Sequence, residues 1–453
     1  MELTLALLLA SAAAAAYIPR DLSEGARTAT ESACGTGAVA TVTAVATVTA
    51  VATVTAIATV TASALPPPNT SSFGAFEAAS ATTANAISPP TQGLQPINQQ
   101  YQADVLSAIA AIAPTYSNDS KVWQDIQGFE AATVYQDLMD YKYWTGDDSQ
   151  DSYGSSLLEV VTNPDLLSGV GALDNYNDDQ GWWMLAFLHA YRTYGDVEFL
   201  NQTETQFKQV VASSQLSASD AGTTPDLAGV TRSVKIPASC DVAGAVYWRQ
   251  TADSSINAVS TGLVAQIGAI LYGITGQDAY RQAADSALNY ERRVLLSSTG
   301  VMDVDSITTA ICSHNGGSLC YNTGIYIDAC TRLYQATNDG QYLKWATSSV
   351  TAAISGVFGN STSATLVVDQ GDNSADTFFS ALTEFYVEIN SQNTSTELQD
   401  QIRTFVKANR DYVVAHDKQS NNLYSENWVD QTAGTAWGTG SVLSLLMAAM
   451  IML

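Results

Sequence analysis

Apolar side chains recur three and four residues apart along most of the chain after about residue 99. This spacing places them on one face of an α-helix, so it predicts a helical domain. Strand signals are thin there, and the Gly- and Ser-rich stretches 217–244 and 297–320 are expected to be long loops. The pattern divides into twelve expected helices, over residues 101–113, 127–145, 150–161, 178–194, 197–213, 255–274, 277–296, 321–336, 340–355, 372–389, 395–416 and 439–452.

A short junction recurs between neighbouring helices of this domain. An aromatic residue is followed by Gly or Asn, then by Asp or Gln, and a second aromatic residue follows shortly afterwards. Gly just past the last turn ends a helix, and Asp just beyond it can begin the next one. Each junction therefore predicts a tight corner between two packed helices. The four junctions span Tyr143–Tyr153, Tyr191–Phe199, Tyr272–Tyr280 and Tyr334–Tyr342.

Twelve helices joined in pairs predict an all-α fold, an (α/α)6 toroid or barrel of six helical hairpins. An open helical solenoid is the alternative. The closed ring needs the apolar segment Val442–Leu453 as its last helix. The competing interpretation of that segment is a GPI-attachment signal, which would associate the protein with a membrane.

The first 98 residues have a different pattern. Residues 1–16 are apolar and end in an alanine run, which is typical of a signal peptide. Residues 39–62 repeat with a period of six, mostly as VATVTA, and Pro-containing segments follow. A transmembrane helix is one interpretation, but Val and Thr favour extended backbone, and such Thr-rich sequences are typical of O-glycosylated stalks. We expect a signal peptide at 1–16, a disordered low-complexity stalk at 17–98 and one folded domain at 99–453.

Composition narrows the possible functions. The 453 residues include 18 Lys and Arg against 44 Asp and Glu, which gives a formal net charge of −26. This balance counts against nucleic-acid binding, which needs clustered basic residues. Only His189, His314 and His416 are present and they lie far apart, so no metal and no cofactor are expected. Any chemistry should therefore depend on carboxylates.

Secretion is supported by two further features. Cys34 lies in the expected stalk, while Cys240, Cys312, Cys320 and Cys330 lie in the domain, where disulfides would form after secretion. Four cysteines allow three pairings, and the sequence does not choose among them. Five N-glycosylation sequons predict a glycoprotein, at Asn69, Asn118, Asn201, Asn360 and Asn393.

The most informative segment is Asn177-Asp178-Asp179-Gln180-Gly181-Trp182-Trp183, at the start of an expected helix. Two acidic residues in a first turn also cap a helix, so their position alone does not assign them a role. The neighbouring residues favour chemistry, because aromatic faces stack on sugar rings and a glycoside hydrolase needs two carboxyl groups at the glycosidic bond. Similar aromatic and amide groups lie near other helix starts, at Trp248, Asn257, Tyr321 and Asn322.

With these motifs, residues 99–453 resemble the family-76 glycoside hydrolases, the endo-α-1,6-mannanases of bacteria and fungi, including fungal cell-wall mannosidase-like proteins. The resemblance implies an (α/α)6 catalytic domain and a retaining mechanism, with Asp178 as the nucleophile and Asp179 as the general acid/base. Thr261 and Thr323 depart from the family pattern, where amides are expected. The resemblance implies that substrate is bound by Asn177, Gln180, Trp182, Trp183, Trp248, Asn257, Tyr321 and Asn322.

These observations together predict a secreted mannan endo-1,6-α-mannosidase of the extracellular space or cell wall. Its expected partner is a polysaccharide, either α-1,6-mannan or GPI-glycan-like mannosides, and it is expected to be a monomer that binds no nucleic acid. Hydrolysis and cell-wall transglycosylation both remain open. The alternatives are a non-catalytic glycan-binding or stalked surface protein on the same fold, and a membrane-tethered structural protein.

Overall fold

The computed structural model describes residues 96–126, 128–251, 254–358, 374–392, 396–428 and 432–453. The predicted signal peptide and most of the predicted stalk lie outside these residues, as do the sequons at Asn69, Asn360 and Asn393. The sequons at Asn118 and Asn201 are within them, and both Asn side chains are exposed. Glycosylation at these two positions stays a prediction.

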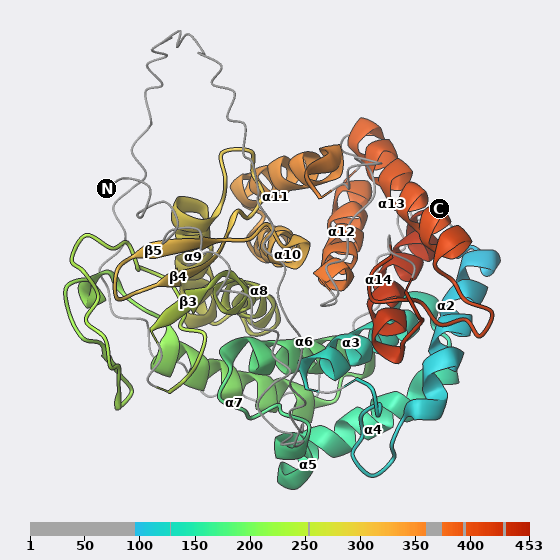
Figure 1. The fold of residues 1–453 in the computed structure, drawn as a ribbon, viewed down its shortest axis with the longest axis horizontal. Coiled ribbons are helices and arrows are strands. Elements are labelled where there is room, and N and C mark those ends of the chain that lie inside the picture. Colours follow the sequence, from blue (N-terminus) through green and yellow to red (C-terminus); the bar gives the residue numbers. More distant parts are fainter. Residues whose placement is uncertain (1–95, 127, 252–253, 359–373, 393–395, 429–431) are drawn as a thin grey trace, which may run out of the picture. The chain divides into compact units, whose positions relative to one another are not determined.

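Six helices form an inner ring. Each contacts the next in chain order, and the last contacts the first, which closes the ring (Figure 1). Each inner helix is preceded by an outer one that returns the chain, so the six inner helices all run in the same direction. The inner helices are α3 (Phe129–Thr145), α6 (Asn177–Tyr194), α8 (Ala258–Thr275), α10 (Cys320–Thr337), α12 (Ser374–Ser391) and α14 (Ala436–Met452).

A second layer of six helices packs around this ring. These are α2 (Gln99–Ile112), α4 (Asp151–Thr162), α7 (Val197–Ser214), α9 (Asp278–Tyr290), α11 (Gly340–Ala352) and α13 (Thr396–His416). The prediction of an all-α (α/α)6 barrel is therefore confirmed, and each of the twelve expected helices is present. The sequence analysis missed several short elements: helix α5 (Pro164–Gly169), 3₁₀ turns η1 (Ala113–Thr115), η2 (Asp148–Gln150) and η3 (Ala218–Asp220), and π turns η4 (Glu291–Leu295) and η5 (Ala353–Val357).

The predicted corners have the expected geometry. Each of four inner helices ends on a residue with positive φ, namely Gly146 (69°), Gly195 (73°), Gly276 (69°) and Asn338 (56°). The following Asp side chain caps the next helical turn at three corners, where Asp147, Asp196 and Asp339 accept backbone N–H groups. A left-handed residue followed by an Asp cap reverses the chain within a few residues.

A layer of glycines lies near the start of the inner helices. The fifth residue is glycine in four of them, α6, α8, α10 and α14. A Cβ atom on Gly181 would lie 2.7 Å from Leu263 of α8, and one on Gly324 would lie 2.8 Å from the Phe378 Cα of α12. The missing side chains thus allow neighbouring inner helices to approach closely at this end of the ring.

The residue before each of three of these glycines is a threonine that holds a loop. The Oγ1 atom of each threonine accepts a backbone N–H from the segment that returns from the preceding outer layer. The bonds are Val246 to Thr261 at 3.1 Å, Met302 to Thr323 at 3.0 Å, and Tyr424 to Thr439 at 2.9 Å. Thr261 and Thr323, which depart from the family pattern, therefore anchor loops in this chain.

The two stretches expected to be loops contain strands, so that prediction is wrong in part. A hairpin joins β1 (Asp226–Leu227) to β2 (Val230–Thr231), and a three-stranded antiparallel sheet contains β3 (Ser255–Asn257), β4 (Val304–Thr308) and β5 (Ser313–Gly316). The strands have at most five residues. Within β4, Ile307 is the one buried residue. Such short strands carry little alternation of apolar and polar residues, which explains why the sequence pattern did not reveal them.

Two inner helices are strongly apolar. Within the described ranges, α8 is the one helix long and apolar enough to cross a membrane, and 72% of it is buried inside the structure. Helix α14 is buried along nearly its whole length, and it contacts α2, α3, α12 and α13. Packing inside the double ring accounts for the composition of both helices.

Buried charges join the inner helices toward their C-terminal ends. Arg192 of α6 donates to Asp140 of α3 at 2.6 Å and to Glu384 of α12 at 2.6 Å. Arg332 of α10 lies 3.0 Å from the same Glu384 oxygen, and His189 lies 2.5 Å from Asp140. The network spans four of the six inner helices.

Glu384 is the carboxylate shared by the two arginines of this network. Its side chain is buried, and burial alone would raise its pKa. The charges of Arg332 and Arg192 outweigh that effect and lower the pKa of Glu384 to about 2. Glu384 is therefore ionised at every pH near neutrality.

Candidate functional site

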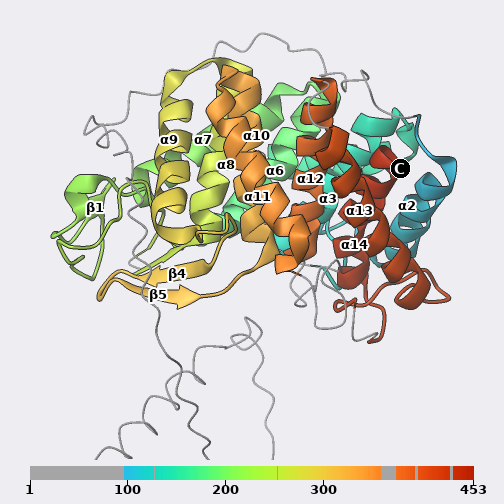
Figure 2. The same ribbon diagram turned by 90° about the horizontal axis from the view of Figure 1, so that it is seen from above.

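The two adjacent aspartates lie where the inner helices begin, an end of the ring that we call the N-terminal rim. Strand β3 leads directly into α8, and β5 ends four residues before α10 begins. Figure 2 shows β4 and β5 along this end of the ring, beside the ends of the helices. The rim is therefore built from helix starts, the small sheet and the loops anchored by threonine.

Asp178 and Asp179 occupy the second and third residues of α6. Asp178 is 2% exposed, and Asp179 is half-buried. The indole Nε1 of Trp248 donates to Asp178 Oδ2 at 3.0 Å, and the backbone N–H of Asp179 donates to Asp178 Oδ1 at 3.1 Å. Both carboxylate oxygens of Asp178 thus accept N–H donors, which orients the group and stabilises its negative charge. The N-terminus of α6 adds to this stabilisation.

A strap, residues 247–251, holds the start of α6 in place. The backbone N–H of Asn177 donates to Trp248 O at 2.8 Å, and its side-chain Nδ2 donates to Tyr247 O at 2.7 Å. The Arg249 guanidinium lies 4.6 Å from the ring centroids of both Tyr176 and Trp248. The indole that contacts Asp178 is thereby fixed by backbone pairing on one side and by cation–π packing on the other.

A buried arginine fixes the far side of this strap. Arg232 is 1% exposed, and its Nη1 donates to Arg249 O at 2.8 Å and to Thr251 O at 2.5 Å. Its Nη2 donates to Ser213 O at the end of α7 at 2.5 Å. Sequence reasoning missed Arg232, because its partners are backbone carbonyls and an aromatic ring rather than acidic residues at a regular spacing.

Two of the predicted aromatic groups meet at the rim. The rings of Trp182 on α6 and Tyr321 on α10 lie 6.4 Å apart, edge to face. Helix α8 separates these two helices in the ring, so the contact crosses the interior. Next to Tyr321, the buried Asn322 donates from Nδ2 to Asp305 of β4 at 3.4 Å.

Other residues expected to bind substrate have structural partners within the protein. Gln180 donates to the backbone oxygen of Asp174 at 2.5 Å, and Asn257 caps α8 by accepting the Ser260 N–H at 3.2 Å. Trp183 is fully buried, and its ring packs against Tyr135 and Phe187. These contacts give Asn177, Gln180, Trp183 and Asn257 packing or backbone-holding roles, and substrate binding by the four residues stays a prediction.

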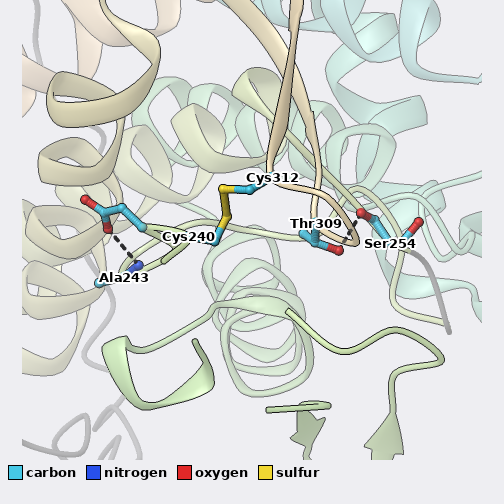
Figure 3. The surroundings of a disulfide bond; sticks show 6 residues. Cys240, Ala243, Ser254, Thr309 and Cys312 are labelled. Atoms are coloured by element: carbon cyan, nitrogen blue, oxygen red, sulfur yellow. Dashed lines mark hydrogen bonds between the residues drawn. A yellow bond between two sulfur atoms is a disulfide. The ribbon is translucent and has the colours of Figure 1, made fainter. Parts of the chain in front are cut away.

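A disulfide ties together two of the loops at this end. Cys240 and Cys312 are bonded, and Figure 3 shows the bond between the segment before the strap and the turn that joins β4 to β5. Close by, Thr309 donates from both its backbone N–H and its hydroxyl to Ser254 O. Cys320 and Cys330 are both buried. The disulfide thus links the loop that supplies Trp248 to the hairpin that leads into α10.

Removal of this disulfide should destabilise the domain. The bond joins cysteines 72 positions apart and so restricts the unfolded chain. The double variant Cys240→Ser/Cys312→Ser should therefore lose about 2–4 kcal/mol of unfolding free energy. Denaturant unfolding with and without reductant measures this loss. Reductant should lower the stability of the wild type and leave that of the double variant unchanged. Equal stability of the two oxidised proteins would contradict the expectation.

No metal centre is evident in the part of the chain that the structure describes. Within those residues no group of three or more His, Cys, Asp or Glu side chains is placed to hold a metal ion. Asp178 and Asp179 are held by an indole, by backbone groups and by a helix terminus.

The fold is shared with solved structures of carbohydrate-active proteins. The α-1,6-mannanase of Salegentibacter sp. HEL1_6 is similar with 18% identity and a TM-score of 0.63, over 77% of this chain and 98% of that one. An inactive variant of that enzyme in complex with α-1,6-mannotriose is similar with 17% identity and a TM-score of 0.63, over 77% of this chain and 99% of that one. Dfg5 from Chaetomium thermophilum in complex with glucosamine is similar with 14% identity and a TM-score of 0.59, over 78% and 90%.

A family comparison agrees with the fold comparison. No curated protein matches the chain. The model of glycosyl hydrolase family 76 matches residues 237–453, which include the strap, the β3–β5 sheet and inner helices α8, α10, α12 and α14. Asp178 and Asp179 precede the matched residues, within the part of the ring that completes the barrel. The resemblance drawn from the sequence is thereby confirmed, because the model of glycosyl hydrolase family 76 matches this chain over residues 237–453.

Proposed function

We propose that this protein is a secreted, retaining glycoside hydrolase that cleaves α-1,6-mannosidic bonds in mannan, a mannan endo-1,6-α-mannosidase. The observation that carries the proposal is the Asp178–Asp179 pair on an inner helix, with the Asp178 carboxylate held by the Trp248 indole. Asp178 is the nucleophile and Asp179 is the general acid/base. The half-buried Asp179 is the more exposed of the two and so the better placed to exchange protons with water.

The solved relatives support this assignment. In the Salegentibacter α-1,6-mannanase, variants with two adjacent aspartates replaced, by asparagine or by alanine, are described as inactive and are bound to α-1,6-mannotriose or α-1,6-mannotetrose. Asp178 and Asp179 are likewise adjacent. Neighbouring residues on a helix diverge by about 100°, so their carboxyl groups can approach one bond from two directions.

The reaction proceeds in two steps. Asp178 attacks the anomeric carbon and forms a glycosyl–enzyme ester, while Asp179 donates a proton to the departing glycosidic oxygen. Asp179, now a carboxylate, takes a proton from water, and the resulting attack on the anomeric carbon releases Asp178. Two inversions return the anomeric carbon to its original configuration.

Transfer to a sugar hydroxyl uses the same intermediate. If a sugar replaces water in the second step, the enzyme acts as a cell-wall transglycosylase. The similarity to the fungal Dfg5 structure with bound glucosamine favours testing sugar acceptors. A non-catalytic glycan-binding protein on the same fold would retain mannan and release no products.

Digestion of linear α-1,6-mannan, followed by proton NMR of the first products, tests the proposal. We expect shortened oligosaccharides whose new reducing ends first appear in the α configuration. Longer oligosaccharides formed with added acceptor indicate transglycosylation. First products in the β configuration overturn the retaining mechanism, and bound but intact mannan overturns catalysis.

A further inference from the structure

The glycine layer fixes the direction in which side chains at the rim point. The fifth residues of α6, α8 and α14 each face the sixth residue of the next inner helix. A Cβ atom on Gly181 would lie 2.7 Å from Leu263, one on Gly262 2.7 Å from Ile325, and one on Gly440 2.8 Å from Val134. The fifth residue thus faces the following inner helix, and the sixth residue faces the preceding one.

Helix geometry then places the second residue of each inner helix. Successive residues are about 100° apart, so the interior of the ring lies about 50° beyond the fifth residue, between the directions of the fifth and sixth. The second residue is about 300° before the fifth, which is equivalent to about 60° beyond it. Second residues therefore point into the ring at the rim.

Two contacts agree with this placement. Tyr321, the second residue of α10, meets Trp182 of α6 across the interior. The ninth residue has nearly the same direction as the second, and the ninth residues of α8 and α10 are both buried and bonded, with Gln266 Nε2 donating to Asp328 Oδ2 at 2.6 Å. The rotation of the inner helices deduced from the glycines therefore agrees with these contacts of α6, α8 and α10.

The same position on α14 is a tryptophan. Trp437 is half-buried, and among the described residues its indole N–H has no hydrogen-bond partner. Helix α14 is separated from α6 by α3 on one side, as α10 is separated from α6 by α8 on the other. The second residues of the inner helices with described side chains are Glu130, Asp178, Val259, Tyr321 and Trp437.

We propose that Trp437 is a sugar-binding platform of the site, opposite Tyr321 with respect to Asp178. A mannosyl ring stacks on the exposed part of its indole face. This inference rests on the proposed function and extends it: the substrate is a mannan segment long enough to reach from the aspartates to α14. The site therefore discriminates by chain length, through binding rather than through the chemical step.

The kinetic parameters of Trp437→Ala test this inference, on linear α-1,6-mannooligosaccharides from the disaccharide to the hexasaccharide. We expect KM to rise roughly tenfold for the longer substrates with kcat little changed, since stacking acts equally on the bound and transition states. Trp437→Phe keeps a smaller aromatic face, so its KM should lie between those of the wild type and Trp437→Ala. The matched control is Trp345→Ala, a half-buried tryptophan on outer helix α11, which should leave KM unchanged.

The outcomes separate the two proposals. If the wild type does not cleave mannan, the function proposal fails, and the platform is tested by calorimetric binding of the same oligosaccharides to wild type and Trp437→Ala. A KM or binding constant that Trp437→Ala leaves unchanged at every length overturns the platform. An equal loss in Trp345→Ala, or a loss in kcat alone, also overturns it. If Trp437→Ala does not fold, Trp437→Phe decides through its effect on KM.

Discussion

Asp178→Asn should lose at least about a thousandfold in kcat on α-1,6-mannan while keeping the fold. An amide cannot form the glycosyl ester, so the first step of the retaining mechanism is removed. The amide oxygen can still accept the Trp248 N–H that holds the carboxylate in the wild type at 3.0 Å, so the start of α6 should stay in place. Single-turnover kinetics with reducing-end detection measures the loss, and circular dichroism with thermal unfolding checks the fold.

A matched control and a rescue sharpen this result. Asp165 on α5 is exposed and also lies in a first helical turn, so Asp165→Asn makes the same chemical change on a helix outside the inner ring and should keep full activity. Asp178→Ala with added azide should form a β-mannosyl azide, because a small anion can occupy the volume left by the carboxylate. Undiminished activity of Asp178→Asn would remove Asp178 from the mechanism.

Glu384→Gln should lower the free energy of unfolding by about 3–5 kcal/mol. The substitution keeps the volume but leaves Arg192 and Arg332 without the buried carboxylate that both contact. Urea unfolding followed by tryptophan fluorescence measures the difference. Glu388→Gln, on the same helix and hydrogen-bonded to the side chains of Gln335 and Gln392, is the matched control and should change stability by far less.

The same residue predicts a specific acid dependence. The pKa of Glu384 is about 2 in the folded protein against an ordinary value of 4.5, so the unfolded chain takes up the proton first as the pH falls. The stabilisation from this group is complete above about pH 4.5 and is lost as the pH falls toward 2. A fall of the Glu384 pKa from 4.5 to about 2 corresponds to a contribution to the unfolding free energy on the order of 3 kcal/mol. The stability difference between wild type and Glu384→Gln should therefore shrink across this range, and a constant difference would contradict the assignment.

The parts of this fold that depend on short-range patterns could be predicted from the sequence. Helix periodicity and the Gly–Asp corners are read within a few residues, and both are present in the structure. The strap could not be foreseen, because the Asn177 side chain donates to the backbone oxygen of Tyr247, a residue 70 positions away. The Cys240–Cys312 pairing likewise depends on loop positions that only the closed ring defines.

The two tryptophans that follow Asp178 and Asp179 show another limit of prediction from the sequence. Trp182 and Trp183 look equivalent in the sequence, yet a helix turns about 100° between them. Trp182 reaches Tyr321 at the rim, whereas Trp183 is fully buried beside Tyr135. The direction of each side chain depends on how α6 is rotated in the ring. That rotation is set by the contact of Gly181 with Leu263 of another helix.

The glycine layer also separates two properties of the rim that depend on different contacts. A side chain at Gly181, Gly262, Gly324 or Gly440 would push neighbouring helices apart, so the aperture of the barrel is fixed by the scaffold. The loops around it are held by polar contacts to the inner helices, including one threonine that accepts a backbone N–H in each of three returns. Loops held in this way can be replaced without moving the inner helices that set the width of the barrel. Chemistry on the helix starts can thus be conserved while the loops adapt the entrance to different glycans.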